Sequence, residues 1–157
     1  MEIDFLKNKP QFAEKVALHW HNEWSQDKSD SDLGKQKKGI LAKSNIGRVP
    51  FILVAFDGDT FCGSAALFEN DLDSMPELGP WLAGVFVAEG FRGQGIASKL
   101  VERVFDEAKK LGFDKIYLHT ETAAKLYEKL GCKKICETKN DRGELTTVFV
   151  MSLTGNP

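Results

Sequence analysis

Apolar residues recur at every fourth position near the start of the chain and predict a helix there. The helix begins near Pro10, a residue suited to a first helical turn. An aromatic stripe at this spacing is typical of core packing, and its members are Phe12, Val16, Trp20 and Trp24. The alternative is that Phe12, Trp20 and Trp24 line a binding pocket. The polar segment 25–31 predicts a loop, and residues 33–43, around an apolar pair, predict a second, weaker helix.

Strand patterns follow. Residues 51–56 and 61–68 are apolar runs joined by Asp-Gly-Asp-Thr at 57–60, and Asp-Gly is a strong signal for a hairpin turn. Residues 81–87 form a nearly unbroken apolar run, which predicts a strand buried on both faces. Gly84 lies inside this run and indicates a bulge.

The most regular helix pattern lies in the second half of the chain. Residues 96–111 place their apolar side chains in one broad stripe, and Gly112 ends the helix. Residues 116–119 then predict a short strand, 123–130 a short helix and 134–153 a last hairpin. This order predicts a single α/β domain with a mixed sheet.

Composition narrows the classes of protein that this pattern fits. A chain of 157 residues, 42% hydrophobic and 28% charged, is typical of one globular domain. Its formal net charge of −2 provides no field that would attract nucleic acid or an anionic membrane. No apolar run approaches the length of a membrane span, and residues 1–10 lack the pattern of a secretion signal, so we expect a cytoplasmic protein.

The cysteines and histidines do not indicate a metal site. Three cysteines without paired spacing do not suit zinc, so we expect reduced packing residues at Cys62, Cys132 and Cys136. His19 and His21 lie two positions apart on the predicted helix and therefore face different directions. We expect no metal.

The segment 91–97, Phe-Arg-Gly-Gln-Gly-Ile-Ala, lies between the most buried strand and the most regular helix. Gly93 and Gly95 remove side chains where the backbone turns, so consecutive amide groups at the helix start can point at a ligand. These amides, the positive end of the helix dipole and the charge of Arg92 favour an anion such as phosphate. Ala97 is small enough to leave room for it.

Two familiar phosphate motifs do not fit these residues. A Walker loop requires Gly-Lys followed by Ser or Thr, whereas Ser98 precedes Lys99 and no glycine stands before that lysine. A dinucleotide fingerprint would require its third glycine at Ser98, and only one strand–helix–strand unit follows.

The remaining pattern, Arg-x-x-Gly-x-Ala at Arg92, Gly95 and Ala97, resembles the acetyl-coenzyme A signature of the GNAT family of N-acetyltransferases, in a bacterial-type, small-domain form. Leu-Tyr-Glu-Lys-Leu-Gly at 126–131 follows with the spacing that the family shows. The resemblance implies a mixed, mostly antiparallel central sheet with a splayed strand pair, flanked by helices. It also implies one N-acetyltransferase domain, with residues 1–48 as a helical acceptor-side region and 49–152 as the coenzyme-binding core.

The resemblance also assigns roles to residues of this chain. The main chain of the central strand would pair with the pantetheine arm at Val85, Phe86 and Val87. Amides of the glycine turn would hold the diphosphate at Arg92, Gly93, Gln94, Gly95, Ile96 and Ala97. Tyr127 stands where relatives often carry the tyrosine that protonates the departing thiolate. Glu89 replaces a common proline, and residues 120–122 lack an asparagine that many members carry.

An amine attacks a thioester only when it is neutral, so a base must remove a proton. Four acidic residues are expected near the open end of the gap between the two splayed strands: Glu69, Asp71, Glu77 and Glu89. Glu69 is the leading candidate because it ends a strand that should border the acceptor pocket. His119 also suits proton transfer, although a polar residue at a strand end is the simpler interpretation.

These observations predict an enzyme that transfers an acetyl group from acetyl-CoA to a primary amine by direct attack in a ternary complex. The acceptor is an amine-bearing small molecule or a peptide. The alternative is a catalytically silent module that binds acyl-CoA as a sensor. The sequence does not decide between a monomer and a homodimer.

Overall fold

The computed structural model describes residues 1–24 and 33–154, so the loop predicted at 25–31 lies outside the described residues. The strands are β1 (Glu2–Phe5), β2 (Phe51–Asp57), β3 (Thr60–Phe68), β4 (Trp81–Val87), β5 (Lys115–Thr120), β6 (Lys133–Lys139) and β7 (Leu145–Ser152). The helices are α1 (Ala13–Trp24), α2 (Leu33–Ala42), α3 (Ile96–Lys110) and α4 (Ala124–Lys129), with 3-10 turns at Leu6–Asn8 and Pro10–Phe12. None of the described helices is long and apolar enough to cross a membrane.

The strands form one sheet in the order β1-β2-β3-β4-β5-β7-β6. Among the described strands only β4 and β5 run parallel, and every other neighbouring pair is antiparallel. The predicted mixed, mostly antiparallel sheet is therefore confirmed. β1 is a strand that the sequence analysis did not assign, and it pairs with β2 from Glu2↔Phe56 to Phe5↔Leu53.

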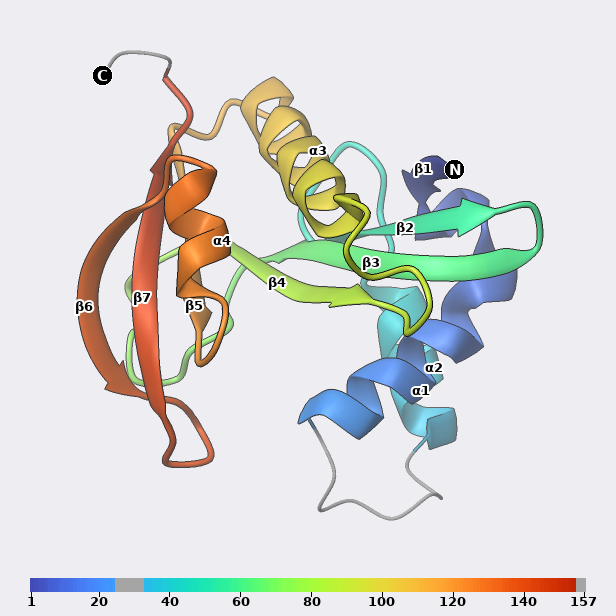
Figure 1. Ribbon diagram of the computed structural model, residues 1–157, viewed down its shortest axis with the longest axis horizontal. Coiled ribbons are helices and arrows are strands. Elements are labelled where there is room, and N and C mark those ends of the chain that lie inside the picture. The colour runs from blue at the N-terminus through green and yellow to red at the C-terminus, as the bar shows by residue number, and fades with distance from the viewer. Residues whose placement is uncertain (25–32, 155–157) are drawn as a thin grey trace.

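Helices cover both faces of the sheet (Figure 1). Alternate residues of β2 enter two different cores: Phe51, Leu53 and Ala55 pack in the core that contains α3, while Ile52, Val54 and Phe56 pack in the core that contains α1. This explains why β2 is apolar without a polar face. The predicted stripe of α3 packs onto the first core with Leu100, Val101 and Val104 completely buried.

The predicted bulge in β4 is present at Gly84, which has φ of +62°. Ala66 pairs with Ala83 and Ser64 with Phe86, so β4 carries an extra residue opposite β3. β4 leaves its other neighbour before it reaches the bulge, because β4 and β5 are paired only at Trp81↔Tyr117. Figure 1 shows the two strands diverging from this point. The expected splayed strand pair is therefore observed.

The bulge is held in place by α1 through a chain of hydrogen bonds. The Trp20 indole Nε1 donates to the Ser64 hydroxyl (2.9 Å), and that hydroxyl donates to the Gly84 carbonyl (2.8 Å). Ser64 is completely buried. A Cβ at Gly84 would stand 2.3 Å from Cζ2 of Trp20, so the indole packs directly on the glycine.

Replacing Gly84 with alanine should destabilise the protein more than the same change in an open turn. Gly58 is the matched control because its φ is +59° and no other residue lies within 4 Å of its Cβ position. We expect Gly58→Ala to cost about 1 kcal/mol of unfolding free energy from backbone strain alone. Gly84→Ala should cost about 3 kcal/mol because overpacking against Trp20 is added. Denaturant unfolding measures both, and equal losses would contradict this account of the bulge.

Candidate active site

The turn between β4 and α3 forms a nest of backbone amides, defined here as residues 92–97. Gly93 and Gly95 both have φ of +78°, and apart from its chain neighbours no described residue lies within 4 Å of either Cβ position. Gly95 caps α3 without a side-chain hydrogen bond, and the Lys99 amide donates to the Gly95 carbonyl at 3.2 Å. The amides ahead of Lys99 have no helical partner, so the nest has the open space and the donors that a diphosphate requires.

Arg92 ties the nest back to β4. Its Nε donates to the Val87 carbonyl (3.0 Å), and its guanidinium lies 5.9 Å from the centre of the Phe86 ring. The side chain therefore fixes the end of the strand and keeps a positive charge beside the nest.

Two cavities meet along β4. The nest cavity, about 510 Å³, includes residues of the nest in its lining, and the acidic cavity, about 520 Å³, lies toward β5 and the β6–β7 turn. They share the lining residues Glu23, Val85, Phe86, Val87, Ala97 and Leu126. A molecule held at the nest and lying along the end of β4 would therefore reach the acidic cavity.

The acidic cavity gathers aromatic rings and carboxylates from elements that are far apart in the sequence. Its aromatic lining includes Trp20, Trp24 and Phe68, and its carboxylates are Glu23, Asp71, Glu121 and Asp141. Arg142 also lines the cavity, but its Nε pairs with Glu144 at 2.9 Å, which offsets its charge. Negative charge between aromatic walls favours a cationic guest.

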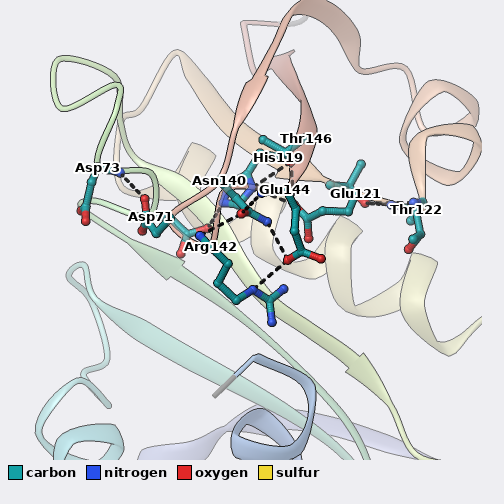
Figure 2. Close-up of polar contacts among 12 residues, drawn as sticks. Asp71, Asp73, His119, Glu121, Thr122, Asn140, Arg142, Glu144 and Thr146 are labelled. Atoms are coloured by element: carbon teal, nitrogen blue, oxygen red, sulfur yellow. Dashed lines mark hydrogen bonds and ion pairs between the residues drawn. The ribbon is translucent and has the colours of Figure 1, made fainter. Parts of the chain in front are cut away.

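His119, on β5, is the centre of a hydrogen-bonded cluster in the wall of this cavity (Figure 2). Its Nε2 lies 3.0 Å from Oδ2 of Asp71. Its Nδ1 lies 3.3 Å from Oε2 of Glu121 and 3.1 Å from Oγ1 of Thr146. The cluster joins the β3–β4 connection, the end of β5 and β7 at one point.

The electrostatic surroundings shift the pKa values of two members of the cluster. Burial alone would lower the pKa of His119, but the hydrogen bond and charge of Asp71, with those of Glu121, outweigh burial and raise it above its usual value. Burial also raises the pKa of Asp71, and the contact with His119 only partly offsets this. Both shifts move proton exchange by this pair toward neutral pH, which is the range a general base requires.

Tyr127, on α4, lines the acidic cavity and is 6% exposed. Burial raises the pKa of its phenol well above the ordinary value. In the described part of the chain every fully buried polar side-chain atom has a hydrogen-bond partner. No described residue partners the Tyr127 hydroxyl, so this hydroxyl is open to the cavity.

The structure brings together some of the residues singled out from the sequence and leaves others apart. Most of the predicted coenzyme residues line the nest cavity: Val85, Phe86, Val87, Arg92, Gly93, Gly95, Ile96 and Ala97. Gln94 is exposed and is not among its lining residues. Glu69, Glu77 and Glu89 are also exposed and line neither cavity, whereas Asp71 lines the acidic one. The geometry therefore places Asp71, and not Glu69, in the wall of the acidic cavity.

The sequence analysis gave too little importance to some residues of the acidic cavity and did not identify others. Phe12 and Val16 are buried core residues as predicted, but Trp20 and Trp24, from the same stripe, line the acidic cavity. His119 was interpreted mainly as a polar strand end, and Thr146 was not considered. The sequence feature that favours a functional role for His119 is its position at the end of the strand that borders the gap between the splayed strands.

Comparison with known proteins identifies the family. The model of the Acetyltransferase (GNAT) family matches residues 13–132, most of the chain, so the chain belongs to that family. A protein of Schizosaccharomyces pombe (strain 972 / ATCC 24843), N-alpha-acetyltransferase 30, is 36% identical over 85 residues, which are 52% of this chain and 56% of that protein. The chain thus spans about half the length of this curated relative.

Solved structures share the fold over their whole length. An aminoglycoside 6'-N-acetyltransferase complexed with coenzyme A is 17% identical with a TM-score of 0.77, covering 100% of this chain and 99% of the other. The aminoglycoside 6'-acetyltransferase type Ii is 19% identical with a TM-score of 0.77, covering 100% of both chains. The protein yncA of Salmonella typhimurium, with its cofactor acetyl-CoA, is 19% identical with a TM-score of 0.73, covering 99% and 95%.

The nest predicts the effect of one substitution on coenzyme binding. Gly95→Glu would place a carboxylate and a strained backbone in the nest, so we expect it to abolish binding of coenzyme A in calorimetry. Gly112→Glu is the matched control, because Gly112 also has positive φ (+92°) with open space around it but lies beyond the other end of α3. Undiminished affinity in Gly95→Glu would refute the site.

Proposed function

We propose that this protein transfers an acetyl group from acetyl-CoA to a primary amine, which attacks directly while both substrates are bound. The observation that carries the proposal is the cleft formed by the two cavities. It runs from a nest suited to a diphosphate, along the free end of β4, to a cavity with carboxylates and a histidine. One chain supplies every residue named here, so the proposal holds for a monomer and a homodimer alike.

In this proposal acetyl-CoA supplies the activated thioester, and the protein positions it. The nest amides and Arg92 hold the diphosphate, and the main chain of Val85–Val87 lies along the pantetheine arm. Strand addition of this kind requires a strand with an unpaired edge, and β4 has one beyond Trp81, where its pairing with β5 ends. The acetyl group then lies where the two cavities meet.

The cysteines support direct attack rather than an acetylated enzyme. Burial raises the pKa of Cys132 to about 11 and also raises that of Cys62, so both thiols stay protonated and are weak nucleophiles. None of Cys62, Cys132 and Cys136 lines either cavity.

The proton of the incoming amine goes to the pair formed by Asp71 and His119. Both side chains line the acidic cavity, and they share a contact of 3.0 Å between Oδ2 and Nε2. Glu69, the leading candidate from the sequence, is two residues away from Asp71 and outside the lining, so it is the weaker choice for this role.

Tyr127 is the hydrogen-bond donor to the departing sulfur. Its raised pKa keeps the phenol protonated throughout the neutral range, so a donor is always present in the cavity. A phenol with a high pKa stabilises the developing thiolate by donating a hydrogen bond, and solvent completes the protonation.

The acceptor is an amine with additional positive charge. Four carboxylates line the acidic cavity, and the charge of Arg142 is offset by Glu144. Aminoglycosides, the substrates named for two of the structural neighbours, carry several amines, whereas the Schizosaccharomyces pombe relative is named an N-alpha-acetyltransferase, a name that indicates a single α-amino group. The charge of the cavity favours polyamine-like acceptors, which carry several positive charges, over peptide termini that carry a single amine.

A thiol-release assay with a panel of amines and peptides tests this function. We expect turnover of primary amines, with a KM about fivefold lower for a diamine than for a monoamine of the same chain length, the effect of one exposed ion pair of about 1 kcal/mol. Added salt should raise the KM of the diamine more than it raises the KM of the monoamine, because salt screens the extra ion pair. Mass spectrometry after incubation with acetyl-CoA alone should show the unmodified protein.

Two results would contradict this proposal. An acetylated protein that passes its acetyl group to the amine would replace direct attack with a covalent route. Coenzyme binding without turnover of any acceptor on the panel would favour the alternative, a catalytically silent sensor.

Removing the hydroxyl of Tyr127 should affect turnover and not coenzyme binding. We expect Tyr127→Phe to lower kcat about a hundredfold and to leave the Kd for coenzyme A nearly unchanged. Because the pKa of Tyr127 is raised, the wild-type kcat should show no alkaline loss from phenol ionisation up to about pH 10. Equal kcat for both proteins across the pH range would remove the donor role.

A further inference from the structure

A buried threonine touches the histidine on the side away from Asp71. Thr146, on β7, is 1% exposed, and its Oγ1 lies 3.1 Å from Nδ1 of His119. The same hydroxyl donates to Oε2 of Glu121 at 2.6 Å, a distance typical of a strong hydrogen bond to a carboxylate. Figure 2 shows Thr146 and Glu121 together beside the imidazole.

The hydrogen bonds of this threonine determine which nitrogen of His119 carries a proton. A threonine hydroxyl has one proton, and here Glu121 receives it. The Thr146 oxygen can therefore only accept from His119, so Nδ1 must carry a hydrogen. Oε2 of Glu121, 3.3 Å from Nδ1, is a second acceptor for that hydrogen. Nε2 faces Oδ2 of Asp71 at 3.0 Å, so these two atoms can share one further proton between them.

From this geometry we infer that Thr146 and Glu121 are positioning residues, which hold His119 in the tautomer protonated at Nδ1 so that Nε2, with Asp71, accepts the proton of the acceptor amine. The inference rests on the proposed function and names the atoms that perform its proton transfer. The step balances: the amine loses one proton to the Nε2–Oδ2 pair, attacks as a neutral nucleophile, and the pair later releases the proton to solvent.

Packing holds the ring in this orientation. Trp81, which is completely buried, meets the imidazole edge-to-face at 5.8 Å between ring centres. The indole is itself fixed because its Nε1 donates to the Leu78 carbonyl at 2.7 Å. β5 and β7 are paired from Lys115↔Ser152 to Thr120↔Thr147, which places Thr146 just beyond the paired end of β5. The cluster thus lies at the end of the β5–β7 strand pair, which is paired without a register shift.

The charges around the ring give the pH dependence a definite direction. Asp71 and Glu121 contact the imidazole from two elements, and Asp141 and Arg142 of the β6–β7 turn line the same cavity. Because both contacting carboxylates favour the charged ring, kcat/KM should rise with pH through a midpoint above the usual pKa of histidine. Removing the charge of Glu121 should move this midpoint to lower pH.

The tautomer can be measured without any substrate. The chain has three histidines, so nitrogen-15 NMR of the side chains can assign His119 by comparison with a His119→Asn variant. Above the midpoint we expect wild-type His119 to be protonated at Nδ1. In Thr146→Val, which keeps the shape and loses the hydroxyl, this tautomer should lose its dominance. Thr147→Val, at the neighbouring position of β7, is the control and should leave the spectrum of His119 unchanged.

Kinetics provide the second readout. We expect Thr146→Val to lower kcat about tenfold with little change in the KM for acetyl-CoA, and Thr146→Ser, which restores the hydroxyl, to recover most of that loss. Glu121→Gln should lower kcat and shift the midpoint of kcat/KM downward. Glu121→Gln and Thr146→Ser keep the inference testable if Thr146→Val does not fold, since the Glu121 side chain is 25% exposed.

The outcomes separate this inference from the proposed function. A wild-type His119 protonated mainly at Nε2, or a tautomer and pH profile unchanged in Thr146→Val and Glu121→Gln, would overturn the inference even if the enzyme acetylates amines. A protein with the expected tautomer that acetylates no amine would refute the proposed function and, with it, the catalytic use assigned to Nε2.

Discussion

The structure depends on the point at which β4 leaves β5. A strand in the middle of a sheet normally pairs along its whole length on both sides, but β4 pairs with β5 only at Trp81↔Tyr117, and the extra residue at Gly84 then adds a local twist to the unpaired part of the strand. The backbone beyond the bulge then has a free edge inside the protein rather than at its rim. Such an edge needs a partner, and in the proposed function the pantetheine arm is that partner.

The same bulge couples the two halves of the cleft. Trp20 packs on Gly84 and reaches its carbonyl through Ser64, so α1 cannot shift without disturbing β4. α1 also supplies Trp20, Glu23 and Trp24 to the lining of the acidic cavity. The helix that stabilises the opening of the sheet therefore also forms one wall of the acidic cavity, which is the acceptor site in the proposed function. On the far wall, β5 and β7 hold His119 between two carboxylates.

Local patterns were sufficient for most of the fold. The period of apolar residues predicted α1, α3 and the hairpin of β2 and β3, and Gly84 predicted the bulge, because each of these depends on neighbours in the sequence. β1 escaped prediction because four residues give too short a pattern, and its pairing with β2 is a long-range contact. The stripe of α1 was interpreted mainly as core, with the lining of a pocket as the alternative, and the structure divides it: Phe12 and Val16 enter the core while Trp20 and Trp24 reach the cavity. The helical period locates a face and does not show where the core beneath it ends.

The site was predictable only in part, because sequence patterns identify continuous segments and not contacts between distant ones. The nest is a continuous segment, so its glycines and its place before α3 indicated an anion site directly. The cluster around His119 includes Glu121, two residues away, but it also draws Asp71 from the β3–β4 connection and Thr146 from β7, and no spacing in the sequence connects these two with His119. The choice of Glu69 as the leading base placed the carboxylate at the strand end, whereas the connection after β3 brings Asp71 to the cavity instead.

A crystal structure of the protein with acetyl-CoA tests the central claim most directly. The account predicts the diphosphate within hydrogen-bonding distance of the amides of residues 93–97, and the pantetheine arm beside the main chain of Val85–Val87 in the gap between β4 and β5. Acetyl-CoA bound outside this gap, or a gap closed by continued pairing of β4 with β5, would contradict it.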